Sequence, residues 1–311
     1  MMKRGITIIE LLVAIVILLV LGAGIYTAYI NLIRNAISRS LVAKQEQDVN
    51  ALVFQLKKDI SSIGFGIEKA YLRPYGADGT IACNNLNTFA NSNSSIARCL
   101  QDTNREELYF LSLAGRQEGN AGCWWYVDAS GGLNSFSKSY TLQNCPASPP
   151  TDRTCLITNA VKQRLYLGNC PNSFTNYTNS FVFYVGSGSY SSNYAFRYYA
   201  DSTSLPPECA PGTYNLRKQA NGDVPQPVIS CVGAFRVRFF DGNNYATTLT
   251  DINNLKAIRL CLLLQVGGRT TTLMDVPSFS SHCGGTIATN PEWRWYRWAV
   301  IEELIPLENI R

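Results

Sequence analysis

The sequence predicts an α+β fold, in which a long N-terminal helix packs on an antiparallel β-sheet with disulfide-pinned loops. Three observations predict it. An apolar N-terminal stretch continues as an amphipathic one, later segments are rich in aromatic and β-branched residues, and all ten cysteines follow the apolar stretch. Because the helix precedes the strands instead of alternating with them, the class is α+β.

Composition sets broad limits on the function. The 311 residues are 46% apolar and 16% charged, enough for a sizeable core in one or two domains. The net charge of +5 is mild, and no basic stripe follows Lys3 and Arg4, which argues against a nucleic-acid interface. An even number of cysteines in Gly-, Ser- and Asn-rich sequence indicates disulfides and an oxidising compartment, with free buried thiols as the alternative.

The N-terminal stretch has the length of a membrane span. Residues 6–30 are almost wholly apolar, and a helix of this length spans about 37 Å, more than the hydrocarbon core of a bilayer. A cleaved secretory signal fits poorly, because no small-residue cleavage site directly follows the stretch. Lys3 and Arg4 precede it and favour a cytoplasmic N-terminus. Apolar residues then keep a three-and-four spacing as far as Ile63, so we expect the helix to continue until the glycines that follow.

One acid, Glu10, lies inside the apolar stretch, where an unpaired carboxylate is unfavourable. With the basic leader, Gly5 before Ile6 and the apolar helix after Glu10, the sequence resembles the prepilin processing motif of type IV pilins and related pseudopilins. The resemblance implies that a prepilin peptidase cuts between Gly5 and Ile6 and methylates the new amine of Ile6. It also implies that Glu10 pairs with this amine of a neighbouring subunit during assembly. The alternative is that Glu10 only favours the helix N-terminus, an effect of about 0.3–1 kcal/mol.

The resemblance also divides the chain. It implies a cleaved leader at 1–5, a transmembrane half-helix at 6–30, an amphipathic half-helix at 31–66 and a β-rich extracytoplasmic domain at 67–311. Residues 54–67 and the order of the last strands resemble PilW-type minor pilins. Glu308 stands where that type has an arginine, a departure that weakens the likeness to the subfamily but not to pilins.

Strands are expected wherever aromatic or branched residues are bounded by Gly, Asn, Ser or Pro. These segments are 106–114, 123–127, 164–168, 180–186, 193–200, 235–239, 257–269 and 293–307. Arg236 and Arg238 alternate with apolar residues, as in a strand that is half-buried in an antiparallel sheet. Residues 257–269 are more hydrophobic than the segment around Arg236 and Arg238, which predicts a central strand. In 293–298, alternating Trp and Arg residues favour structural packing over a platform for a ligand.

Polar insertions separate these strands. Residues 84–95 and 145–155 contain too few apolar residues to form a core, so we expect surface loops pinned by local disulfides. The pairs that enclose them are Cys83–Cys99 and Cys145–Cys155.

We expect no catalytic residue, metal site or cofactor. His282 is the only histidine, and Cys283 beside it has no C-x-x-C partner for a zinc site. A Cys/His nucleophile is disfavoured because disulfide cysteines are inert. Glu106 and Glu107 are adjacent, so in a strand they point to opposite faces and do not form an acid/base pair.

These features together predict a minor pilin, a structural subunit of a type IV pilus or of its initiation or tip complex. The partners implied by the resemblance are the prepilin peptidase, other minor pilins, the major pilin and the inner-membrane assembly platform. The implied location is the inner membrane before assembly, and the periplasm and extracellular pilus afterwards. Three alternatives stay open: a type II secretion pseudopilin, a tip module that binds DNA or surface glycans, and an anchored extracytoplasmic enzyme. No motif supports a nucleic-acid or glycan ligand, and the missing catalytic residues argue against the enzyme.

Overall fold

The chain divides into two compact units, residues 1–50 and 51–311. The computed structural model describes residues 18, 21–22, 24–26, 28–30, 32–33, 47, 49–65, 72–92, 94–112, 123–137, 148–149, 154–159, 164–186 and 195–310. In the first unit every described residue is helical. Six large apolar side chains are exposed there: Leu18, Leu21, Ile25, Tyr26, Tyr29 and Leu32.

Among the described residues, no helix combines the length and the apolar character needed to cross a bilayer. The predicted span at 6–30 lies largely outside the described residues and stays a prediction.

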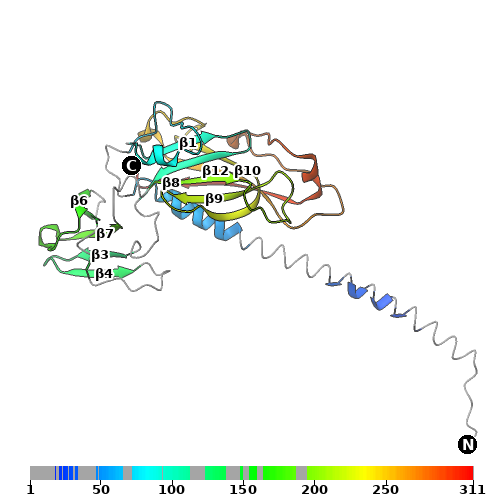
Figure 1. Ribbon diagram of the computed structural model, residues 1–311, viewed down its shortest axis with the longest axis horizontal. Helices are drawn as coiled ribbons and strands as arrows, with labels where there is room; N and C mark the ends of the chain where they lie inside the picture. The colour runs from blue at the N-terminus through cyan, green and yellow to red at the C-terminus, as the bar shows by residue number, and fades with distance from the viewer. Residues whose placement is uncertain are drawn as a thin grey trace, which may run out of the picture. The chain divides into compact units, whose positions relative to one another are not determined.

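The larger sheet of the second unit has eight strands in the described residues (Figure 1). They are β1 (Ile96–Leu100), β2 (Glu106–Leu111), β8 (Ala195–Asp201), β9 (Tyr214–Ala220), β10 (Gln226–Phe240), β11 (Tyr245–Ala246), β12 (Ala257–Gln265) and β13 (Trp298–Pro306). Their order is β1-β2-β8-β9-β10-β12-β13, with β11 paired to β10. Each pairing is antiparallel. The predicted antiparallel α+β class is therefore confirmed.

A smaller sheet has five antiparallel strands in the order β4-β3-β7-β5-β6. They are β3 (Cys123–Val127), β4 (Leu133–Ser137), β5 (Thr154–Asn159), β6 (Arg164–Asn169) and β7 (Ser180–Gly186). Its own core contains Trp125, Ile157 and Val182, each fully buried. Short helices complete the described elements: α2 (Leu86–Ala90), η2 (Thr175–Tyr177), η3 (Ile252–Asn254), η4 (Ser281–Cys283) and η5 (Pro291–Trp295).

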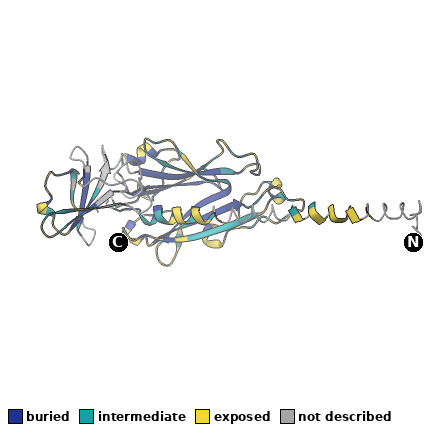
Figure 2. Cartoon of the chain, turned by 90° about the horizontal axis from the view of Figure 1, so that it is seen from below, coloured by how far each residue is buried: buried dark blue, intermediate teal, exposed yellow. Residues whose placement is uncertain are grey.

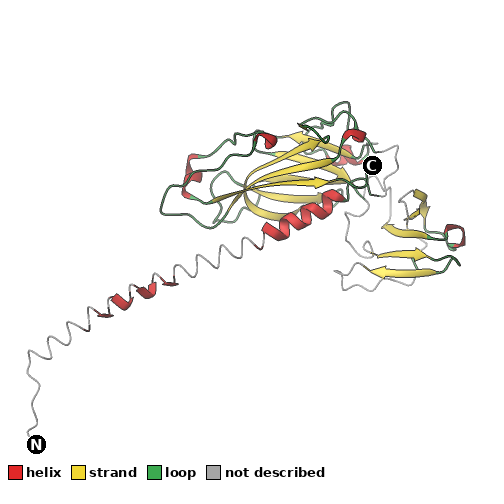
Figure 3. Ribbon diagram, turned by 180° about the vertical axis from the view of Figure 1, so that it is seen from behind, coloured by secondary structure: helices red, strands yellow, loops and turns green. Residues whose placement is uncertain are grey.

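Helical residues 51–61 lie along one face of the larger sheet (Figure 3). Leu52, Leu56 and Ile60 recur every four residues, so they share one face, and all three are buried. Val53 and Leu56 lie against Leu260 and Leu262 of β12 and against Ile301 and Ile305 of β13. The opposite side is exposed (Figure 2), and the Phe54 side chain there is 63% exposed.

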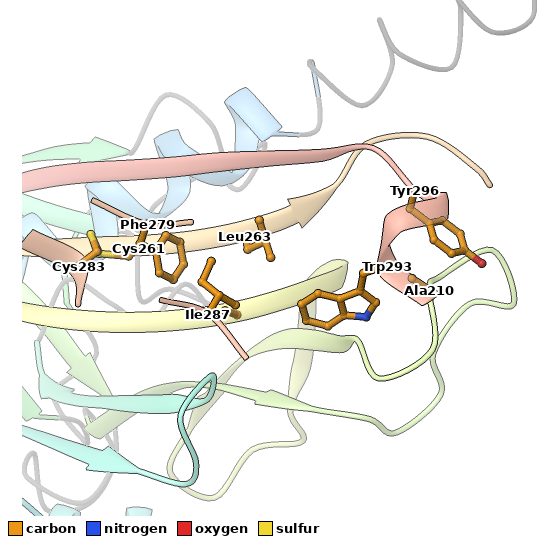
Figure 4. Packing of buried hydrophobic residues seen from close by; sticks show 9 residues of the cluster. Ala210, Cys261, Leu263, Phe279, Cys283, Ile287, Trp293 and Tyr296 are labelled. Atoms are coloured by element: carbon orange, nitrogen blue, oxygen red, sulfur yellow. A yellow bond between two sulfur atoms is a disulfide. The ribbon is translucent and has the colours of Figure 1, made fainter. Parts of the chain in front are cut away.

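Strand β12 is covered on both faces, which explains why most of its residues are apolar. Leu260 and Leu262 face the helix, whereas Cys261 and Leu263 belong to a second cluster with Phe279, Ile287 and Trp293 (Figure 4). The prediction of a central strand here is confirmed, because β12 pairs with β10 on one side and β13 on the other.

The predicted last strand, 293–307, begins too early. Residues Pro291–Trp295 form η5, and strand β13 starts only at Trp298. Pro291 fits the first helical position, and the Asn290 side chain accepts a hydrogen bond from the Glu292 N–H, so the local sequence starts a helix. Trp293 is buried, and its indole N–H donates to the Pro211 carbonyl. Its ring is therefore part of the packing, as predicted, and not a platform for a ligand.

The arginines of β10 were read as the polar side of a half-buried strand. In the structure Arg236 is only 5% exposed and Arg238 only 8%. Both guanidinium groups donate to the carbonyl of Cys283, so the segment around η4 covers this side of the strand. Arg236 and Cys283 are 47 positions apart in the sequence. The alternation of residues within one strand cannot reveal that such a distant loop covers it.

Candidate functional site

The predicted processing and assembly residues, Gly5, Ile6 and Glu10, lie outside the described residues and stay predictions. Residues 51–65 and the sheet residues that contact them show how the helix packs on the larger sheet.

A buried acid fixes the helix to the sheet. Asp59 is 4% exposed and accepts a hydrogen bond from the Tyr198 hydroxyl of β8. Its carboxylate also lies 2.7 Å from the Lys218 ammonium of β9. Burial, and then the Asp59 charge, raises the pKa of the Tyr198 phenol well above its usual value, so this hydroxyl keeps its proton and donates. The sequence analysis did not single out Asp59, although an acid directly beside Ile60 on the apolar face was a usable signal.

The end of the helix is held by residues late in the chain. Gly64 adopts a left-handed φ of +77°, and a Cβ there would approach the Ile310 side chain to 3.1 Å. The Asn309 side-chain amide donates to the Ser61 carbonyl over 2.7 Å. Gly64 thus ends the helix, as predicted, in a conformation that favours glycine and allows the C-terminal residues to pack closely.

Disulfides stabilise the second unit. The eight cysteines whose side chains are described form four bonds: Cys83–Cys99, Cys155–Cys170, Cys209–Cys231 and Cys261–Cys283. The first is the pair expected around residues 84–95, where the predicted loop contains the short helix α2.

The predicted pair Cys145–Cys155 is wrong. Cys155 pairs with Cys170 at a Cα–Cα distance of 4.8 Å, and Cys145 lies outside the described residues. The cause is the antiparallel register of β5 and β6, which places Cys155 opposite Gly168, next to the end of β6 and Cys170. The prediction considered only the loop before Cys155 and did not identify β5 as a strand.

Peptide mapping tests this correction. Non-reduced protein, alkylated and digested, is expected to yield a disulfide-linked peptide pair containing Cys155 and Cys170, which separates on reduction. The Cys83–Cys99 pair serves as an internal control, because both sequence and structure assign it. A linked peptide joining Cys145 to Cys155 would contradict the structure.

The described residues offer little for metal chemistry. One cluster, Cys83, Cys99 and Glu107, has ligand-type atoms within 4.8 Å of one another. Its two sulfur atoms are bonded to each other, so they are not thiolate ligands and the cluster does not fit a metal. His282 is exposed, and its ring centroid lies 4.7 Å from that of Tyr245. The absence of enzymatic activity stays a prediction.

Comparisons with known proteins bear on the N-terminus. Residues 1–26 match the family described as the prokaryotic N-terminal methylation motif. No curated protein matches the chain. Among solved structures, the chain is similar to a type IV-like pilin from Thermus thermophilus, with 11% sequence identity and a TM-score of 0.37, over 86% of this chain and 98% of that one. A likeness at this TM-score does not establish a shared fold or function, and the match that bears on the N-terminus is the methylation motif at residues 1–26.

The matched region contains Gly5, Ile6 and Glu10, the residues on which the resemblance was based. The chain therefore carries the prokaryotic N-terminal methylation motif over residues 1–26.

Proposed function

We propose that the chain is a minor pilin of the PilW type, a structural subunit of a type IV pilus or of its initiation or tip complex. The observation that carries the proposal is the methylation motif at residues 1–26, in which Glu10 is the one acid of the apolar stretch. Prepilin peptidase removes residues 1–5. The mature chain stays anchored in the inner membrane until the assembly platform incorporates it into the fibre. Other minor pilins and the major pilin are its neighbours in the fibre.

The surface of the first unit supports an anchored and assembled protein. Among its described residues, six large apolar side chains are exposed, and they lie within residues 18–32. Exposed apolar surface of this extent is unfavourable in water and marks contact with lipid or with other proteins. A helix that lies in a bilayer before assembly and packs against like helices afterwards keeps these apolar side chains away from water at both stages.

The motif supplies a driving force for assembly. Cleavage after Gly5 creates a positive amine on Ile6, four positions before Glu10. An unpaired charge at bilayer depth is unfavourable by several kcal/mol. Pairing the Ile6 amine of one subunit with Glu10 of the next neutralises both charges within an apolar environment, and so favours a staggered array of helices.

The N-terminus of the mature protein tests the proposal. Mass spectrometry of the protein from its native host is expected to find N-methylated Ile6 as the first residue, in a chain that co-purifies with sheared fibres. An uncut leader in the native host would overturn the proposal, because the amine that pairs with Glu10 would not exist.

A deletion strain separates the pilus from a secretion system. Loss of pili with intact protein secretion is expected. Loss of type II secretion with normal piliation would assign the chain to a pseudopilus instead.

A further inference from the structure

Three arginines gather on one side of the larger sheet. Arg98 of β1 and Arg236 and Arg238 of β10 are 5%, 5% and 8% exposed. They line a cavity of about 480 Å³ in which Glu106 is the one carboxylate. The lining residues therefore carry a net charge of +2, although the three arginine side chains are themselves largely buried. Buried cations are normally paired, so the excess charge needs a physical account.

Glu106 is already fully engaged. It accepts hydrogen bonds from the Arg98 Nε at 2.7 Å and from the Arg238 Nη1 at 2.9 Å. The Val237 backbone N–H donates to it as well, at 2.7 Å. Two of the three arginines thus share one carboxylate.

Arg236 has no carboxylate within salt-bridge distance among the described residues. Its Nε donates to the Thr103 carbonyl at 3.0 Å, its Nη1 to Cys283 at 3.2 Å and its Nη2 to Thr286 at 2.7 Å. Each terminal nitrogen of an arginine carries a second N–H, so Nη1 and Nη2 both keep a donor. Burial, and then the Arg238 charge, lowers the pKa of Arg236, which shows that its surroundings disfavour the cation.

A glycine in the backbone beside this cavity leaves room for the arginine side chains. Gly284 has a φ of +88°, and a Cβ on it would lie 2.9 Å from the Arg238 Nη2 and 3.2 Å from the Arg236 Nη1. Any side chain at this position would press on both guanidinium groups. The Cys261–Cys283 disulfide fixes the preceding residue to β12. The rim, formed by Thr103, Thr247, Thr286 and Ala288, is exposed, so the cavity communicates with solvent.

We propose that this cavity binds the anionic group, a carboxylate or a phosphate, of a small ligand. Planar guanidinium groups match both oxyanions through paired N–H donors. A volume of about 480 Å³ lies within the range of small-molecule sites, and exceeds what a single inorganic ion fills. An anion here supplies the counter-charge that Arg236 lacks. The inference is independent of filament assembly, because it concerns the purified subunit alone.

Calorimetric titration of the full-length chain in detergent, at constant ionic strength, tests the proposal. The probes are glucose 6-phosphate, glucuronate and, as a neutral control, glucose. At least one anionic sugar is expected to bind while glucose does not, and the stronger of the two identifies the preferred oxyanion. No heat of binding for either anion at millimolar concentration would overturn the proposal.

Variants locate the binding. Arg236→Gln removes the charge but keeps an amide donor, and is expected to weaken binding by at least about tenfold. Arg269→Gln is the matched control, because it removes the same charge from an exposed pair with Glu292 and is expected to leave affinity unchanged. Ala288→Phe narrows the exposed rim without altering charge, and is expected to weaken binding too, should Arg236→Gln not fold. Affinity that both cavity variants leave unchanged would place the binding elsewhere and reject this site.

Discussion

Glu10→Ala is expected to leave the protein cleaved and inserted in the membrane, but to reduce its incorporation into fibres by at least about 100-fold. Without the carboxylate, the methylated amine of a neighbouring Ile6 has no counter-charge in an apolar environment. The penalty for such an unpaired charge is several kcal/mol, and about 2.8 kcal/mol already corresponds to 100-fold. Quantitative immunoblotting of sheared fibres against the membrane fraction measures the ratio.

The matched control is Glu46→Ala, which removes an acid from the same N-terminal region but outside the matched motif. It is expected to be incorporated normally. Incorporation of Glu10→Ala at the level of the wild type would show that the acid serves only the helix terminus, where its effect is about 0.3–1 kcal/mol.

Glu106→Gln is expected to lower the free energy of unfolding by about 3–5 kcal/mol, the usual effect of leaving buried charges without their partner. Glu106 is 1% exposed and is the one carboxylate that faces Arg98 and Arg238. A glutamine keeps the shape but turns an N–H₂ group toward guanidinium donors. For a unit of this size the melting temperature is expected to fall by roughly 10 °C, measured by circular dichroism.

Glu292→Gln provides the comparison. Its pair with Arg269 joins side chains that are 50% and 59% exposed, and exposed pairs contribute about 0–1 kcal/mol. Equal melting temperatures for Glu106→Gln and Glu292→Gln would mean that the buried cluster does not stabilise the fold.

Local patterns predicted the elements that are set locally. The strands at 123–127 and 180–186 have the predicted bounds, and the apolar run 257–269 is the central strand β12, shortened to Gln265. The amphipathic spacing identified the helix face that packs on the sheet, since Leu52, Leu56 and Ile60 are all buried. In each case the pattern of apolar residues lies within the sequence of a single helix or strand, so it can be recognised without knowing what packs against it.

The errors concern contacts between distant segments. The pairing of Cys155 depends on the register of β5 with β6, and the burial of Arg236 depends on a loop that reaches it through the Cys261–Cys283 disulfide. Trp293 lies in η5 and not in a strand, because Asn290 and Pro291 start a short helix just before it. The cationic cavity was missed for the same reason as the buried arginines: alternation alone does not distinguish solvent from a covering loop.

The bond between Ser61 and Asn309 joins residues 248 positions apart, and the sheet residues that cover Val53 and Leu56 come from β12 and β13. During synthesis the helix therefore emerges long before the strands that shelter it. A chain that stops short of β12 lacks the residues that cover Val53 and Leu56, and exposed apolar surface of this kind is recognised by proteases and chaperones. The helix is therefore expected to dock fully only after β12 and β13 have been synthesised, so an exposed apolar helix face distinguishes a truncated chain from one that contains both strands.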